Sequence, residues 1–383
     1  MAADWKSALE RWLGAGLLDP ATAERIRAFE SQREKPQSFR WQVRIAIAFG
    51  GMLLASGILL WVAAHWDDLS PTRRFSLVLT MVAVLHMAGA LIANRFAVLA
   101  TTLHAVGTIS IGAAIFLTGQ IFNLEEHWPG GFMLWAAGAW LGWLLFRDWP
   151  HAAMAAVLTP IWLFGEWNVA TERLLGAERV IPQGALLLAI VYFTSAGKEK
   201  SSAVQKALIW IGGIALIPSV FIATESWYRW GRTAQASSGL LAIGWILAYG
   251  LPLVIAYVLR RRGAWLLALA AVWVFVLGAW GPEQDAGSTA LRYVWHHLGI
   301  YLWCLLGSVG LVAWGLYEES RERINLGVAG FAVTVITFYF ASVMDKLGRA
   351  NTLMGLGVLF LVGGWFLERM RRRLVARLDR GAS

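Results

Sequence analysis

Long apolar runs alternate with short polar turns along most of the chain. A helix needs roughly 20 apolar residues to cross about 30 Å of hydrocarbon, because each residue adds about 1.5 Å. About twelve runs meet or approach this length, at residues 45–66, 75–93, 97–120, 130–146, 151–167, 181–196, 206–224, 238–259, 264–280, 298–317, 324–344 and 350–367. The fourth, fifth, sixth and ninth runs are short enough to change the count. The pattern predicts an all-α, polytopic transmembrane helix bundle.

Composition supports this class of protein. Hydrophobic residues make up 58% of the 383 residues, charged residues only 15%, and the mean hydropathy is +0.57. A soluble globular chain needs more polar surface than this. Since the net charge of +9 belongs to a membrane protein, we interpret it through loop topology rather than as a sign of nucleic-acid binding. The single cysteine, Cys304, excludes a disulfide framework or a cysteine metal cluster.

The distribution of Lys and Arg predicts the orientation. Basic residues gather in the N-terminal segment, in the C-terminal tail and in tight turns such as Arg260 to Arg262 and Lys198 to Lys200. Positive charge favours the cytosolic side of short loops. We therefore expect both termini to be cytosolic, with the two tails supplying most of the signal.

The chain divides into four predicted parts. Residues 1–42 form a cytosolic helical hairpin, in which Asp19 caps the second helix and Pro20 occupies its first turn. Two transmembrane helix blocks follow at 43–196 and 197–367, and residues 368–383 form a basic cytosolic tail. The hairpin either lies on the bundle or the membrane surface or docks a cytosolic protein partner. The tail, with arginines from Arg369 to Arg380, is a topogenic anchor that can contact anionic lipids.

Acidic and histidine side chains gather in two predicted outer turns. The candidate outer-rim cluster is Trp66, Asp67, Asp68, Arg74, Gln120, Glu125, Glu126 and His127. Its carboxylates could hold a hard cation such as calcium or magnesium if the first and third spans are neighbours. The alternative is that outer turns simply tolerate acids, with arginines as counter-charges. We assign no metal and no cofactor.

Two histidines are the ionisable side chains placed well inside the predicted spans. His86 and His104 both fall slightly to the inner side of the midplane and could pair directly or through a water. No Asp, Glu, Lys or Arg is central in a span, which argues against ion-coupled transport. Small and hydroxyl residues on the third and eleventh spans predict close helix packing. Prolines at 160, 218 and 252 interrupt three spans, either as packed kinks or as parts of a transport site.

One outer loop is rich in aromatic residues. Its candidate headgroup contacts are Trp227, Tyr228, Arg229 and Trp230, which could stack on a sugar or bind a lipid phosphate. Most of the 23 tryptophans, by contrast, suit an interfacial aromatic belt.

Three stretches resemble a known family. They are "RWLGAGLLDPATAERI", "AAHWDDLSPTRR" and "TGQIFNLEEHWPGGFMLWAAGAWLGWLLF", and the closing segment from Arg323 to Leu374 is similar to the ends of such proteins. The family is the bacterial membrane-protein family catalogued as domain of unknown function 2157. The resemblance implies a bacterial cytoplasmic (inner) membrane location and no established chemistry. Its matching motif positions are Trp66, Asp67, Arg74, Gly119 and Gln120.

The function favoured by the sequence is non-enzymatic. Turns are short and a catalytic scaffold is not evident, so we expect an accessory protein or a lipid- or solute-handling helix bundle, with membrane lipids as partners and no catalytic residues. Two alternatives stay open. One is a membrane enzyme acting on a lipid-linked sugar or phosphate at the outer face. The other is a transporter with a site near the midplane.

Overall fold

The computed structural model describes residues 5–33, 70–122, 127–197, 201–224, 234–260, 263–279 and 290–343, together with isolated positions between 46 and 64 and between 354 and 369. The predicted spans at 45–66 and 350–367 therefore lie largely outside the described residues. The chain forms two compact units, Met1–Asn123 and Leu124–Ser383, and the boundary falls inside the first helix block expected from the sequence. Each unit is described by itself.

The first unit contains two short and two long helices. They are α1 (Trp5–Gly14), α2 (Pro20–Arg33), α4 (Pro71–Ile92) and α5 (Ala97–Phe122). The start signal at Asp19 and Pro20 is confirmed, because Asp19 accepts a hydrogen bond from the backbone N–H of Thr22. Ser70 caps α4 in the same way, with Pro71 in its first turn. Hydrogen bonding from Thr22 holds the pKa of the Asp19 carboxyl below its ordinary value. Leu9 and Ala23 are buried, whereas Trp12, Leu17 and Phe29 are exposed.

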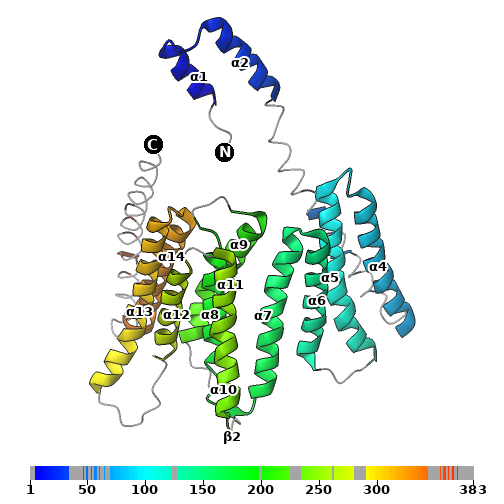
Figure 1. Ribbon diagram of the computed structural model, residues 1–383. Coiled ribbons are helices and arrows are strands. Elements are labelled where there is room, and N and C mark those ends of the chain that lie inside the picture. Colours follow the sequence, from blue (N-terminus) through cyan, green and yellow to red (C-terminus); the bar gives the residue numbers. More distant parts are fainter. Residues whose placement is uncertain are drawn as a thin grey trace. The chain divides into compact units, whose positions relative to one another are not determined.

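The second unit is a helix bundle with one very small sheet (Figure 1). Its elements are α6 (Trp128–Phe146), α7 (Trp149–Thr171), β1 (Leu174–Leu175), α8 (Val180–Phe193), α9 (Ala203–Thr224), β2 (Ala234–Gln235), α10 (Ser238–Trp245), the π-helix η1 (Ile246–Gly250), α11 (Leu251–Arg260), α12 (Ala264–Ala279), α13 (Ala290–Tyr317), α14 (Arg321–Phe338) and the π-helix η2 (Tyr339–Val343). Strands β1 and β2 pair in parallel and tie two helix connections together. The fold is nearly all-α, as the sequence predicts.

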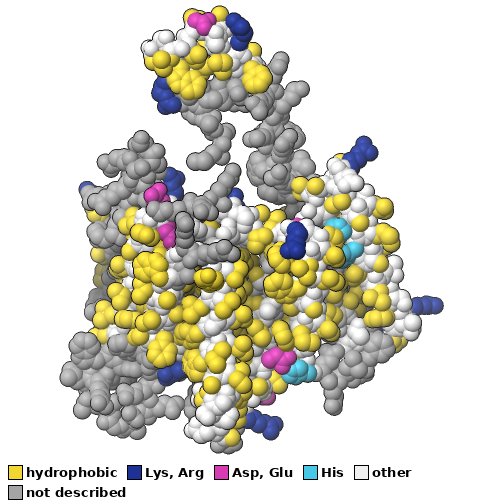
Figure 2. Space-filling view, in the orientation of Figure 1, with side chains coloured by type: hydrophobic (Ala, Val, Ile, Leu, Met, Phe, Trp, Pro, Cys, Tyr) yellow, Lys and Arg dark blue, Asp and Glu magenta, His cyan; other side chains and the backbone are white. Residues whose placement is uncertain are grey.

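Seven helices within the described residues are long and apolar enough to cross a membrane. They are Pro71–Ile92, Ala97–Gly119, Trp128–Phe146, Ala203–Thr224, Ser238–Arg260, Leu298–Tyr317 and Arg321–Ala341. Hydrophobic side chains cover the flanks of these helices, and many are exposed, as expected where lipid is the solvent (Figure 2). The coarse class of the fold is therefore confirmed. The total of about twelve spans stays a prediction.

Helix α8 forms the core of the second unit. Eleven of its 14 residues are buried, including Leu186, Leu187 and Val191, and α7, α9, α11, α12 and η1 pack around it. At about 1.5 Å per residue, 14 residues extend only about 21 Å, which is less than the roughly 30 Å of hydrocarbon in a bilayer. One end of α8 must therefore stop inside the bundle, where its backbone carbonyls need donors from other elements.

Candidate functional site

The C-terminal end of α8 is the most polar buried place in the described structure. Thr194, Ser195 and Ala196 follow the helix and are all buried. Their carbonyls have no further helical turn to supply donors, and in a dry interior each one left without a donor is costly. Part of this need is met by Gln205 at the start of α9, whose side-chain amide donates to the carbonyl of Ser195 at 3.3 Å.

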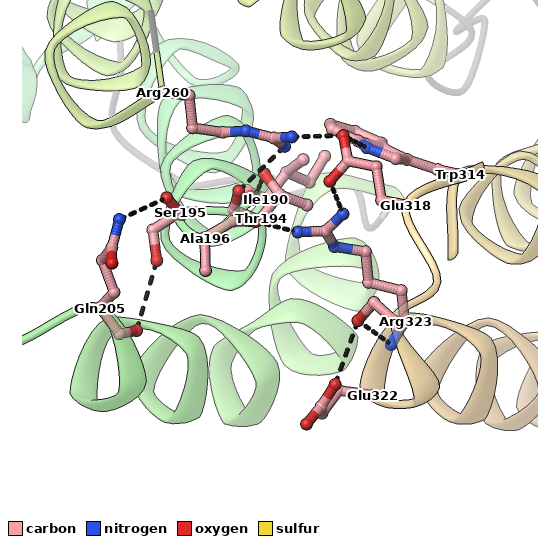
Figure 3. Close-up of polar contacts among 11 residues, drawn as sticks. Ile190, Thr194, Ser195, Ala196, Gln205, Arg260, Trp314, Glu318, Glu322 and Arg323 are labelled. Carbon is pink, nitrogen blue, oxygen red and sulfur yellow. Dashed lines mark hydrogen bonds and ion pairs between the residues drawn. The ribbon is translucent and has the colours of Figure 1, made fainter. Parts of the chain in front are cut away.

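Two arginines from distant elements supply donors to the carbonyls of Thr194 and Ala196. Arg260, the last residue of α11, donates from Nη1 to the carbonyl oxygen of Thr194 at 3.0 Å. Arg323, in the first turn of α14, donates from Nη2 to the carbonyl oxygen of Ala196. Figure 3 shows the two guanidinium groups reaching the same helix end from different sides. Cations at this position also interact favourably with the negative end of the helix dipole.

Glu318 joins the two arginines. Its Oε1 accepts a hydrogen bond from Nη2 of Arg260 and its Oε2 accepts one from Nη1 of Arg323 (Figure 3). The indole N–H of Trp314 donates to Oε1 at 2.8 Å, and both guanidinium carbons lie 5.5 Å from the centre of the Trp314 ring. The three charged side chains are only 3–5% exposed. We call Arg260, Trp314, Glu318 and Arg323 the arginine cluster, and the end of the bundle that carries it the arginine end.

Local sequence shapes the turn that carries Glu318. Glu319 takes a left-handed backbone conformation with φ of 59°, and Ser320 caps α14 by accepting a hydrogen bond from the N–H of Arg323 at 3.4 Å. This tight turn places Glu318 and Arg323 close together although they belong to opposite sides of a helix boundary. The cluster carries two positive charges and one negative charge, so it has a net charge of +1.

The protonation of Glu318 predicts an acid dependence of stability. Burial raises the pKa of its carboxyl, but hydrogen bonds from Arg323, Trp314 and Arg260 outweigh burial and hold the pKa below the ordinary value of 4.5. A carboxyl whose pKa is lower in the folded protein than in the unfolded chain stabilises the fold when it is ionised. This stabilisation is complete above the unfolded-state pKa and is lost as the pH falls through the folded-state pKa. We expect the melting temperature of the purified protein to fall between about pH 5 and pH 3. Glu318→Gln should reduce this fall in melting temperature at low pH. Glu322→Gln changes an exposed carboxylate of the same turn and should leave the fall unchanged. Equal pH dependence of the melting temperature in both variants would contradict the prediction.

An apolar groove runs along α13 from Ile300 to Tyr317. It encloses about 980 Å³ and is lined by α8, α9, α12, α13 and α14. At the arginine end its wall includes Trp314, which belongs to the arginine cluster, and Phe193, which directly precedes Thr194. This volume is at the upper end of the range of roughly 300–1,000 Å³ that is typical of ligand pockets.

Six polar side chains of the groove wall bond to the protein, those of Thr224, Trp273, Trp303, Ser308, Trp314 and Thr334. Trp273 and Trp303 each donate an indole N–H to the other's backbone carbonyl at 3.0 Å. The hydroxyls of Thr224, Ser308 and Thr334 donate to carbonyls one helical turn earlier. A ligand in the groove therefore meets a surface that behaves as hydrocarbon.

The predicted outer-rim cluster is described only in part. Trp66, Asp67, Asp68, Glu125 and Glu126 lie outside the described residues. Arg74 is partly buried in the first turn of α4, and Gln120 belongs to the last turn of α5. The structure gives His127 a partner that the sequence did not suggest. Its Nε2 lies 2.6 Å from Oε2 of Glu166 in α7, and Glu166 also accepts from Trp162 at 3.0 Å.

His86 and His104 lie side by side between α4 and α5, with ring centroids 5.5 Å apart. Each ring packs against a glycine of the opposite helix. A Cβ at Gly89 would lie 2.9 Å from Nε2 of His104, and a Cβ at Gly107 would overlap the His86 ring. Both helices thus present the same His-x-x-Gly pair to each other. This packing needs no ligand, so a functional role for the pair stays a hypothesis.

The other candidates carry less structural information. Trp227, Tyr228, Arg229 and Trp230 lie outside the described residues, as does most of the tail; Arg369 lies 5.0 Å above the ring of Trp365. Within the described part of the chain, no group of three or more His, Cys, Asp or Glu side chains is placed to hold a metal ion. The hypothesis of a hard-cation site at Asp67, Asp68, Glu125 and Glu126 is not tested by this observation.

Apolar helices with a charged cluster at one end define an α-helical membrane protein. Residues 10–152 match the model of a family described as "Predicted membrane protein (DUF2157)", which confirms the family resemblance over the first part of the chain. This segment covers the second half of α1, then α2, α4, α5 and α6, and the start of α7, and it precedes both the groove and the arginine cluster. Neither the curated proteins nor the solved structures gave a match to the chain.

Proposed function

We propose that this protein is a non-enzymatic, lipid-handling helix bundle whose groove along α13 holds hydrocarbon chains. The observation that carries the proposal is the apolar groove of about 980 Å³. Because most of its lining is apolar and its indole groups and three of its hydroxyls are bonded to the protein, the wall offers a polar solute little compensation for the water it would lose. Hydrocarbon chains suffer no such loss.

The proposal includes an orientation. The arginine end faces the cytosol of a bacterium whose inner membrane the chain crosses about twelve times, with both termini inside. Supporting this, Lys198 and Lys200 follow α8 in sequence and Arg261 and Arg262 follow α11, so that short basic turns adjoin this end. Helices α1 and α2 and the turn between them expose apolar side chains at Trp12, Leu17 and Phe29. This surface is suited to a cytosolic protein partner or to the membrane interface. The arginine-rich tail suits anionic lipid.

Filling the groove tests the proposed function. Gly310 lines the groove, and a Cβ at this position would meet nothing within 4 Å. We expect Gly310→Phe to leave folding intact but to weaken lipid retention roughly five- to hundredfold, because a chain beside the new ring suffers an overpacking cost of about 1–3 kcal/mol. Retention is measured by mass spectrometry of lipid that stays bound after detergent exchange.

Leu302→Phe is the matched control. Leu302 is on the same helix and is similarly open to lipid, but it does not line the groove. It should retain lipid like the unmodified protein. If Gly310→Phe and Leu302→Phe retained the same amount, the groove would not be the lipid site and the proposal would fail.

A further inference from the structure

The arginine cluster has unused capacity for an anion. Two guanidinium groups bond to one buried carboxylate, and the exposed carboxylate of Glu322 acts on Arg323 only by Coulomb attraction. A buried net charge is unfavourable unless another group balances it. Within the described residues, the buried Nε atoms of Arg260 and Arg323 have no hydrogen-bond partner. Their Nη atoms, by contrast, bond to Glu318 and to the carbonyls that follow α8.

Two glycines lie over the guanidinium of Arg260. A Cβ at Gly197 would lie 3.9 Å from Nη2 of Arg260, and a Cβ at Gly263 would lie 3.5 Å from the same atom and 4.0 Å from Oε1 of Glu318. Gly197 is exposed and Gly263 is partly exposed. Because glycine has no side chain, these two residues cover the guanidinium of Arg260 with backbone alone. Gly263 has φ of +96°, a conformation that other residues rarely adopt, so this opening is set by the turn itself.

The groove ends beside this cover. Phe193 lines the groove and directly precedes Thr194, which accepts from Arg260. Trp314 lines the groove and binds Glu318. A hydrocarbon chain in the groove would therefore bring its polar head to the arginine end.

We propose that the arginine end is a headgroup site for an anionic phospholipid whose acyl chain occupies the groove. The phosphate binds over Gly197 and Gly263 and balances the charge that Glu318 leaves uncompensated. The guanidinium groups are buried beneath the glycines, so they act on the phosphate through their charge, and arginine suits this role because it stays protonated. The inference rests on the proposed function, since it assigns the headgroup of the lipid that the groove holds.

A carboxylate placed over Arg260 tests the headgroup site. Gly197→Glu can set its own anion against Arg260, and Gly197→Gln has the same shape without the charge. The purified protein is exchanged into nanodiscs containing equal amounts of phosphatidylglycerol and phosphatidylcholine with identical acyl chains, and the lipids retained after re-extraction are counted by mass spectrometry. We expect the unmodified protein and Gly197→Gln to favour phosphatidylglycerol roughly tenfold or more, and Gly197→Glu to bring the ratio close to one.

Several outcomes separate this inference from the proposed function. An equal preference in the Gly197→Glu and Gly197→Gln variants, or a ratio of one in the unmodified protein, overturns the headgroup site alone, provided that Gly310→Phe still loses lipid. Displacement of phosphatidylglycerol by an equal concentration of inorganic phosphate would assign the site to free phosphate and overturn the lipid assignment. If Gly197→Glu does not fold, Gly197→Asp with Gly197→Asn as its match repeats the comparison with a shorter side chain.

Discussion

Replacing Glu318 with glutamine is expected to lower the free energy of unfolding by about 3–5 kcal/mol, the cost typical of removing one partner from a buried ion pair. The substitution keeps the shape of the side chain and removes its charge. Arg260 and Arg323 then remain buried without a counter-ion, and their guanidinium groups repel each other across a dry site. The loss also reaches α8, because the same two arginines bond to the carbonyls of Thr194 and Ala196.

The measurement is thermal unfolding of the detergent-purified protein, followed by circular dichroism. Glu322→Gln is the matched control, since this exposed carboxylate lies four residues further along and outside the cluster. Its effect should stay within about 0.5 kcal/mol. Equal melting temperatures for the two variants would show that the cluster does not stabilise the fold as argued.

Short-range features of the fold are predictable from the sequence because their causes are local. Asp19 with Pro20 starts a helix where expected, and Ser70 with Pro71 begins α4 by the same rule, since a cap and the first turn lie within four residues. The pairing of His86 with His104 can also be predicted from the sequence, because α4 and α5 are consecutive antiparallel helices. Counting residues back from their shared turn places the two rings at similar depth.

The arginine cluster could not be predicted in the same way. Arg260 and Glu318 are 58 residues apart, and in the sequence each stands beside other charged residues, as in an ordinary polar turn. Their burial follows from the shortness of α8, which leaves carbonyls inside the bundle, and from the tertiary arrangement that brings α11 and α14 to them. The short apolar run at 181–196 was the signal available in the sequence. A span too short for the bilayer predicts buried carbonyls, but it does not say which donors reach them.

The pairing of His127 with Glu166 is a similar case. Glu166 falls near the end of a run that reads as apolar, and its partner lies 39 residues earlier on the neighbouring helix. The groove is also a product of tertiary structure, because five helices contribute to its wall. Residue spacing within one helix does not reveal such a space.

Alanine at Gly212 is expected to destabilise the protein by about 1–3 kcal/mol or more, because it wedges two helices apart. Gly212 is where α9 lies closest to α8. A Cβ there would approach the carbonyl oxygen of Ala189 to 2.5 Å and Cα of Phe193 to 2.9 Å. Both obstacles are backbone atoms, which cannot move aside by rotating a side chain.

The neighbouring Gly213 provides the control. A Cβ at Gly213 would lie 3.3 Å from the ring of Phe193, and a ring can adjust by a few tenths of an ångström. Alanine also suits a helix interior better than glycine by up to about 1 kcal/mol, so Gly213→Ala should be neutral or stabilising. The two adjacent substitutions thus have opposite expected signs in the same melting experiment. Because Phe193 directly precedes Thr194, a displaced α9 should also disturb the carbonyls that the arginines bind, and Gly212→Ala should then weaken the acid dependence conferred by Glu318. A Gly212→Ala variant as stable as Gly213→Ala would mean that α8 and α9 do not approach each other as closely as the structure shows.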